Sequence, residues 1–221
     1  MGVGATSRRP APGAATGAQA LTDVLADIAK NVQVGAAEMF HGIGVALSRD
    51  GNLDLSLVFL RLGLYLDPSA DVISLALGQL LDAANQHEAA NVIYEAVPIT
   101  SPMKPTAVVR IATNLDATGD RGEALRRLNN IVTSRPEDLD ALSVYGDLLR
   151  YDEQYTKAAE VYSEALELTG GDSPADWRFY YVRGIAYERA KEWPKAEADF
   201  LKALELNPDQ PAVLNYLGYS W

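Results

Sequence analysis

The clearest hydrophobic and polar pattern in the chain runs from Trp177 to Asp209. Apolar side chains recur there every three or four residues, the spacing that places them on one face of an α-helix. The stretch predicts two amphipathic helices joined by a tight turn. Small and aromatic residues occupy set positions on these helices: Gly184, Ala196 and Ala203 are small, and Tyr180, Tyr187 and Phe200 are aromatic.

The same pattern recurs along the chain. A small residue returns at spacings of 34, 34, 34, 38 and 34 in the series Gly44, Gly78, Ala112, Gly146, Gly184 and Gly218. A proline closes most of the units, as Pro68, Pro102, Pro136 and Pro208. Two columns agreeing on one period indicate an internal repeat.

The second helix of each unit carries two further columns in the same register. One column is small: Ser56, Ala90, Ala124, Ala158 and Ala196. The other lies four residues later and is bulky: Leu60, Tyr94, Leu128, Tyr162 and Phe200. Two helices that cross at about 8–10 Å need a residue with little side chain at the contact. We therefore expect the small positions to set the helix spacing and the bulky side chains to fill the space beside them.

This arrangement of small, aromatic and proline positions resembles the tetratricopeptide repeat. The resemblance implies an all-α fold, an α-solenoid of antiparallel helix pairs, with about five and a half repeats after an N-terminal helix. The predicted repeats are residues 37–70, 71–104, 105–138, 139–172, 177–210 and a partial unit at 211–221.

Proline and glycine predict where the helices stop. Each closing proline should end a second helix, at Asp67-Pro68, Ser101-Pro102, Arg135-Pro136 and Asn207-Pro208. Repeat four has Gly170 instead, followed by a four-residue insertion that predicts a longer link. Gly51 and Gly119 fall at the same turn between helices, where glycine tolerates a positive φ.

The two ends of the chain lie outside the regular repeats. Residues 1–20 are rich in Gly, Ala and Pro and predict a disordered linker or tail. Residues 21–36 predict a separate helix that caps the exposed face of the first repeat. The C-terminal half repeat suggests a fragment of a longer protein. Its aromatic residues Tyr216, Tyr219 and Trp221 would expose apolar area through which the chain could self-associate.

Composition limits the partners. The net charge is −11 and no basic cluster stands out, which disfavours nucleic acid and anionic lipid surfaces. No apolar run is long enough to predict a membrane span.

Catalytic and metal-binding constellations are missing from the sequence. Cysteine is absent, and His41 and His87 have no second histidine within helical reach, so neither a nucleophilic triad nor a zinc site can be assembled. Carboxylates such as Glu197 and Asp199 are expected on solvated helix faces. We therefore predict no enzyme, no cofactor and no metal.

The resemblance also implies where a partner binds. In this family the first helices of successive repeats line a concave groove that takes an extended peptide or a partner helix. The groove positions with directional chemistry are Asp116, Asp147, Arg150, Tyr151, Arg178, Tyr181, Glu188 and Arg189. Of the three tyrosines in the last full repeat, only Tyr181 lies outside the core positions. His41 and Val45 replace the lysine and asparagine of the carboxylate-clamp subclass, which disfavours that subclass.

The predicted function is a non-catalytic scaffold or adaptor that binds a protein or peptide. The segment from Lys191 onward resembles longer bacterial repeat proteins of the cell envelope, so the cytoplasm and the bacterial periplasm or envelope both stay open as locations. The alternative is a helical-repeat RNA-binding protein, which would need a basic, aromatic groove. Binding of the partner on the convex face of the solenoid, opposite the groove, is a further alternative.

Overall fold

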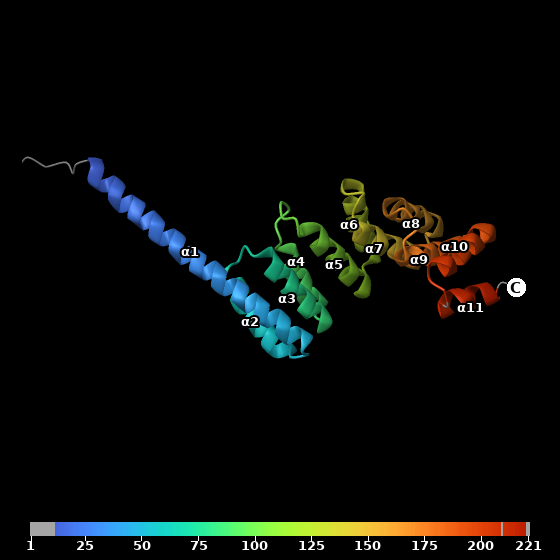
Figure 1. Ribbon diagram of the computed structural model, residues 1–221, viewed down its shortest axis with the longest axis horizontal. Helices are drawn as coiled ribbons and strands as arrows, with labels where there is room; N and C mark the ends of the chain where they lie inside the picture. The colour runs from blue at the N-terminus through green and yellow to red at the C-terminus, as the bar shows by residue number, and fades with distance from the viewer. Residues whose placement is uncertain (1–11, 209, 220–221) are drawn as a thin grey trace, which may run out of the picture. The chain divides into compact units, whose positions relative to one another are not determined.

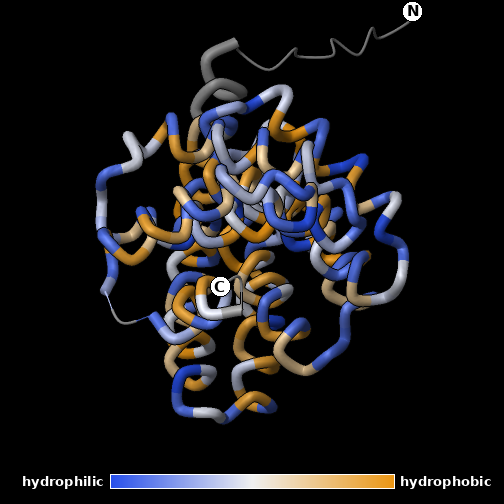
Figure 2. The backbone as a smooth tube through the Cα atoms, turned by 90° about the vertical axis from the view of Figure 1, so that its right-hand side faces the viewer, coloured by the Kyte–Doolittle hydropathy of each residue, from blue (hydrophilic) through white to orange (hydrophobic). Residues whose placement is uncertain are grey.

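The computed structural model describes residues 12–208 and 210–219, with side chains described for residues 19–208 and 210–218. Two compact units share the chain, residues 1–80 and residues 81–221, and each is described by itself. The described residues form α-helices and one short 3₁₀ helix, with no strand (Figure 1). Along the helices hydrophobic and hydrophilic segments alternate, as amphipathic packing requires (Figure 2).

The first unit contains a long helix and its antiparallel partner. The helices of this unit are α1 (Pro12–Arg49), α2 (Leu53–Leu66) and most of α3 (Asp71–Ala83). Gly44 lies against α2, where the Oγ of Ser56 donates a hydrogen bond of 2.7 Å to the Gly44 carbonyl oxygen.

The second unit continues with helix pairs in chain order. Its helices are α4 (His87–Glu95), α5 (Lys104–Ala117), α6 (Arg121–Ser134), α7 (Leu139–Tyr151), α8 (Tyr155–Thr169), α9 (Trp177–Arg189), α10 (Trp193–Leu206) and α11 (Pro211–Tyr219), with the 3₁₀ helix η1 (Pro174–Asp176) before α9. The fold class predicted from the sequence, an α-solenoid of antiparallel helix pairs, is confirmed.

The small residues lie where the bulky ones need space. A Cβ added at Gly146 would lie 2.5 Å from Cε1 of Tyr162, and one added at Gly184 would lie 2.7 Å from Cε1 of Phe200. In the first unit, a Cβ at Gly44 would lie 2.8 Å from Cγ of Leu60. The predicted partnership of small first-helix positions with bulky second-helix positions is therefore present in three repeats.

One residue in each turn between paired helices adopts a positive φ. These residues are Gly51, Asn85, Gly119, Glu153 and Lys191, with φ between 55° and 95°. They follow one another at 34, 34, 34 and 38 residues, the same register as the small positions. Only two of the five are glycine, so the turn geometry is repeated even where the side chain makes it conformationally costly.

The link after repeat four forms as its glycines predicted. Gly170 ends α8 in the left-handed conformation, with φ of 82°. Ser173 and Asp176 then form a capping box around η1, in which the Ser173 side chain accepts from the Ala175 backbone N–H and the Asp176 carboxylate accepts from the Ser173 backbone N–H.

Two predictions near the N-terminus were wrong. Residues 21–36 do not form a separate capping helix, because α1 runs unbroken from Pro12 to Arg49 and the large apolar side chains of its first half stay exposed. Residues 12–20, predicted to be disordered, belong to the same helix, since this stretch is rich in alanine, the strongest helix former. The rest of the predicted tail, residues 1–11, lies outside the described residues.

Two further expectations need correction. Helix α4 ends at Glu95 and not at Ser101, because Pro98 disfavours the helical conformation at Val97. Asp199 is not solvated: it is 6% exposed. Its carboxylate accepts hydrogen bonds of 2.8 and 2.7 Å from the Arg183 guanidinium.

The C-terminal half repeat also differs from expectation. Val213 of α11 is fully buried, and the ring of Tyr216 stacks on Phe200 with centroids 5.4 Å apart. Tyr216 therefore covers repeat five and does not offer a free aromatic surface. The side chains of Tyr219 and Trp221 lie outside the described residues, so self-association through this end stays a prediction.

The Gly146 contact generates the first testable prediction. Gly146→Ala should lower the free energy of unfolding by about 1–3 kcal/mol, because the Tyr162 ring is fully buried and its hydroxyl is held by Asp147, so the ring cannot move aside. The matched control is Gly122→Ala in α6, where an added Cβ meets nothing within 4 Å. That change should stabilise the helix by up to about 1 kcal/mol. Urea denaturation followed by circular dichroism measures both, and equal stability of the two variants would contradict the contact.

The turn geometry generates the second prediction. Glu153→Gly and Lys191→Gly should each raise the free energy of unfolding by about 0.5–1 kcal/mol, because glycine removes the steric cost of a positive φ at an exposed position. Asn85→Gly serves as the control and should gain less, since asparagine tolerates this conformation. Thermal melting compares the three variants, and a loss of stability in the first two would count against the turn assignment.

Candidate functional site

Two adjacent hollows run along the first helices of the second unit. Helices α5 and α7 contact each other, as do α7 and α9. The hollow between α7 and α9 has a volume of about 530 Å³, and the hollow between α5 and α7 has one of about 210 Å³. Asp140 and Ser143 line both, so the two hollows are neighbours along α7, and we call the two together the α5–α7–α9 groove.

The larger hollow combines carboxylates with aromatic and apolar side chains. Its lining residues are Leu139, Asp140, Ser143, Asp147, Ala175, Trp177, Arg178, Phe179, Tyr181 and Val182. Three of the predicted groove residues, Asp147, Arg178 and Tyr181, thus meet in one hollow.

Asp147 is held in place by two donors. Its Oδ1 accepts a hydrogen bond of 2.8 Å from the Tyr162 hydroxyl and one of 3.1 Å from Nη2 of Arg150. Burial, and then the neighbouring Asp147 charge, raise the pKa of the Tyr162 phenol, so the hydroxyl stays protonated and keeps donating. The hydrogen bond from Tyr162 therefore ties the α7 wall of the groove to α8, the second helix of the same repeat.

The sequence suggested that the Tyr181 side chain is free of the core, but its ring forms part of an aromatic cluster. Its ring centroid lies 6.1 Å from that of Trp177 and 6.3 Å from that of Phe200. A third neighbour, Tyr216, meets it edge-on at 5.9 Å. Burial is the main reason that the pKa of Tyr181 is raised. The cluster gives the α9 side of the hollow a rigid aromatic wall.

Two residues that the sequence predicted for the groove carry buried polar atoms without a hydrogen bond. Among the described residues, Nε of Arg150 and Oε2 of Glu188 find no hydrogen-bond partner. Oε2 of Glu188 does lie 3.4 Å from Nε of Arg189, as an ion pair. Unsatisfied buried atoms are costly, and a bound group that supplies the missing partner would relieve that cost.

The remaining predicted residues lie nearer the turns. Asp116 pairs with Arg121, whose Nη1 also donates a 3.0 Å hydrogen bond to the Tyr151 carbonyl oxygen. The Tyr151 ring is exposed and lies under the Arg150 guanidinium at 4.5 Å. Asp116, Arg150, Tyr151, Glu188 and Arg189 are not among the lining residues of the large hollow.

The sequence reasoning missed Trp177 and Phe179. Both line the hollow from the first turn of α9, just after the four-residue insertion. An aromatic residue opening a first helix, together with the inserted link, was the available signal.

A buried polar network between α3, α4 and α5 was also missed. The side-chain Nδ2 of Asn114 lies 2.6 Å from Asp82 and donates to Asn91 at 2.9 Å, while its Oδ1 lies 3.1 Å from Nδ1 of His87. The Tyr94 hydroxyl completes the network with a 2.7 Å bond to Asp82. Asn114 is 3% exposed, so this network fixes the packing of the helices and offers little to a ligand.

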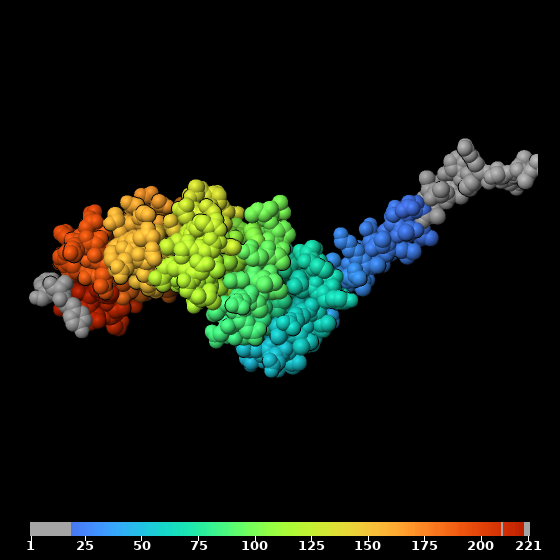
Figure 3. All heavy atoms as spheres, turned by 180° about the vertical axis from the view of Figure 1, so that it is seen from behind, coloured from blue at the N-terminus to red at the C-terminus, as the bar shows by residue number. Residues whose placement is uncertain are grey.

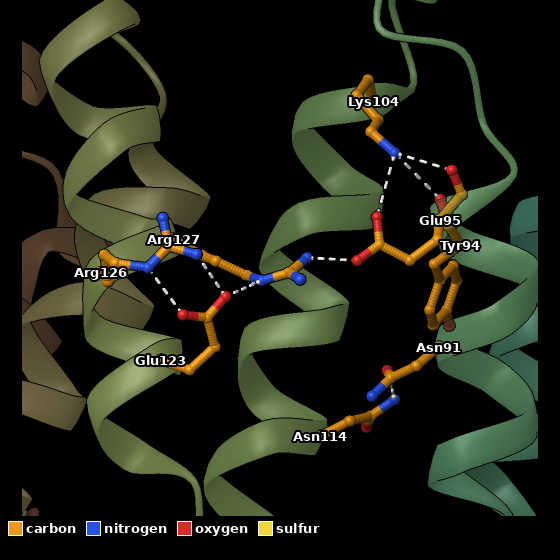
Figure 4. A network of polar contacts seen from close by, with 8 residues as sticks. All are labelled: Asn91, Tyr94, Glu95, Lys104, Asn114, Glu123, Arg126 and Arg127. Carbon is orange, nitrogen blue, oxygen red and sulfur yellow. Dashed lines mark hydrogen bonds and ion pairs between the residues drawn. The ribbon is translucent and has the colours of Figure 1, made fainter.

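Figure 4 shows Asn114 of α5 beside Asn91 of α4 and, further along these two helices and on α6, a set of ion pairs. Arg127 of α6 bridges Glu95 of α4 and Glu123 of its own helix. Hydrogen bonds from Arg126 and Arg127 lower the pKa of Glu123 to about 2. These charges tie second helices together and do not line the α5–α7–α9 groove.

No helix in the described part of the chain is long and apolar enough to cross a membrane.

Comparison with known proteins agrees with the repeat. A tetratricopeptide-repeat family model matches residues 109–173 and again residues 146–211. A UDP-N-acetylglucosamine–peptide N-acetylglucosaminyltransferase of Giardia intestinalis is 35% identical over 83 residues, which is 37% of this chain and 5% of that protein. The human protein O-mannosyl-transferase TMTC1 is 24% identical over 149 residues, or 67% of this chain and 17% of that protein. The chain thus spans a small part of these relatives.

Solved structures show the same fold. The tetratricopeptide-repeat protein YrrB, described as having an unusual peptide-binding site, matches with a TM-score of 0.62 and 20% identity over 81% of this chain and 90% of that one. PilF of Pseudomonas aeruginosa matches with a TM-score of 0.67 and 17% identity over 82% and 81%. With the repeat register, the paired helices and the family model in agreement, residues 109–211 match the tetratricopeptide-repeat family, and the described helices have the fold of that family.

Proposed function

We propose that the chain is a non-catalytic interaction module that binds an extended peptide segment of a partner protein in the α5–α7–α9 groove. The observation that carries the proposal is the large hollow between α7 and α9, where Asp147, Arg178 and Tyr181 converge. YrrB, which has the same fold, has a peptide-binding site, and this supports a peptide as the ligand class.

The lining predicts what such a peptide carries. Trp177, Phe179, Tyr181 and Val182 provide an apolar wall that suits a large apolar or aromatic side chain. Asp140 is exposed at the mouth of the hollow and belongs to both hollows, so it can pair with a basic residue further along the peptide. The proposed ligand is therefore an apolar anchor next to a lysine or arginine.

The rival proposal, an RNA reader, has less support. The groove is lined by three carboxylates, Asp138, Asp140 and Asp147, against two arginines, Arg110 and Arg178. A lining with more carboxylates than basic groups disfavours a phosphate backbone. A role inside a longer bacterial scaffold, and a place in the cell envelope, remain proposals from the sequence resemblance.

A binding experiment with blocked and unblocked grooves tests the proposal. Peptides are selected from a random phage-displayed library on the purified chain, and their affinities are measured by fluorescence anisotropy. Ser143→Trp should fill the shared part of the two hollows, and Arg178→Glu should alter the rim of the larger one. Each change should weaken binding about 5–30-fold, the effect of losing 1–2 kcal/mol.

The control is Arg135→Glu at the end of α6, an exposed charge outside the groove. It should leave peptide affinity unchanged. The proposal fails if no peptide is enriched, or if enriched peptides bind the Ser143→Trp chain as well as the original. Tighter binding of a single-stranded RNA oligonucleotide than of any selected peptide would favour the rival.

A further inference from the structure

We infer that the first half of α1 is a dimerisation arm that pairs with the same segment of a second copy of this chain. We define the arm as residues 19–39. Helix α1 has 38 residues and its partner α2 has 14, so α2 can accompany less than half of α1. In the space-filling view, the blue residues of α1 extend away from the cyan residues of α2 (Figure 3).

The arm carries an apolar stripe that nothing in the described part of the chain covers. Its members are Leu21, Leu25, Ile28, Val32 and Met39, with exposed fractions of 62%, 57%, 55%, 67% and 54%. Five large apolar side chains exposed in a line mark an interaction surface, because isolated exposure is common and alignment is not.

This stripe is distinct from the face that packs inside the repeat. The face of α1 that contacts α2 contains Ala37 and Gly44, both buried. Met39 lies two residues from Ala37, which places it about 200° away around the helix. Helix α1 thus has two apolar faces, and only one of them is used within the described first unit.

The spacing of the stripe fits a helix partner. Its positions follow one another at four, three and four residues, and Gly35 and Met39 continue the three–four alternation. A three–four alternation is the seam of a left-handed coiled coil, in which each side chain inserts between four residues of the facing helix. The glycine weakens the last turn, so the pairing should be of modest strength.

The charges of the arm permit pairing with an identical copy. The six positions that flank the seam are Thr22, Val24, Ala29, Asn31, Ala36 and Glu38, and only Glu38 is charged. The other charges, Asp23, Asp27 and Lys30, fall on the opposite side of the helix, away from the seam. Two copies of a chain with net charge −11 can therefore meet along this seam with only one acidic residue per copy, Glu38, beside it.

A membrane surface is the less favoured occupant. Interfacial helices carry lysine and arginine on their polar face, and the arm has one lysine against two aspartates and a glutamate. Helix α2 offers a second exposed apolar row at Leu55, Val58, Leu62 and Tyr65, which a second copy could use instead. Lysine substitutions in each row, together with lipid vesicles, separate these possibilities.

The test is the oligomeric state of the full 221-residue chain by sedimentation velocity between about 1 and 100 μM, the range expected for a small interface. The original chain should show a dimer that dissociates on dilution. Leu25→Lys combined with Ile28→Lys should raise the dissociation constant at least about tenfold, since two charges would enter the apolar seam. At a concentration where both chains are monomeric, the melting temperature should stay unchanged, because both residues are exposed in the monomer.

The matched control is Asp27→Lys, a change to lysine in the same turn on the opposite side of the helix, which should leave the dimer intact. Because the chain has no cysteine, Ile28→Cys and Asp27→Cys report on proximity: oxidation should link the first into dimers more than the second. A monomer at every concentration overturns the proposal. A dimer that survives the double lysine change also overturns it, as does a dimer that dissociates only with Leu62→Lys. A monomer that binds anionic lipid vesicles would likewise overturn it.

Discussion

The contact between a residue without a side chain and a bulky residue on the facing helix is the constraint on which the structure depends. Gly146 accommodates Tyr162, Gly184 accommodates Phe200 and Gly44 accommodates Leu60, and in each case a single added carbon would overlap the neighbour. Because these contacts recur in one register, the same small-to-bulky contact sets how closely the helices approach in all three pairs. A repeated contact of this kind is what a solenoid of similar units requires.

The groove follows from that stacking. When first helices of adjacent repeats contact one another, their outward side chains lie in rows, and the rows of α7 and α9 enclose the large hollow. Tyr162 connects the two levels of organisation: its ring fills the space over Gly146, and its hydroxyl holds Asp147 in the groove wall. The side chain that sets the helix spacing thus also positions a residue of the candidate binding site.

Much of the fold could be predicted from the sequence because side-chain size recurs with the period of the repeat. Small positions, bulky positions and turn glycines share one period, and the structure keeps it even at Glu153 and Lys191, which adopt a positive φ without being glycine. Helix ends were harder to predict, because local residue preferences compete there with the repeat pattern. Pro98 ended α4 early, and the alanine-rich start of α1 joined the first repeat without a break.

Pairings between repeats could not be predicted, since spacing says which face a residue occupies but not which partner it meets. Asp199 was expected in solvent and instead binds Arg183 in a buried ion pair. Tyr181 was assigned to the groove, where it does line the large hollow, but its packing against Trp177 and Tyr216 was not foreseen. Three of the eight predicted groove residues line the large hollow, and their contacts with neighbouring helices could not be predicted from spacing.

A double-mutant cycle between Gly146 and Tyr162 tests the central contact most directly. The free energy of unfolding is measured for the original chain, for Gly146→Ala, for Tyr162→Leu and for the double variant. Repeat three already combines Ala112 with Leu128, both fully buried. The cost of adding a methyl group at Gly146 should therefore fall by at least about 1 kcal/mol once Tyr162 is replaced by leucine. Equal costs of Gly146→Ala in the tyrosine and leucine backgrounds would show that the two residues do not set the helix spacing together.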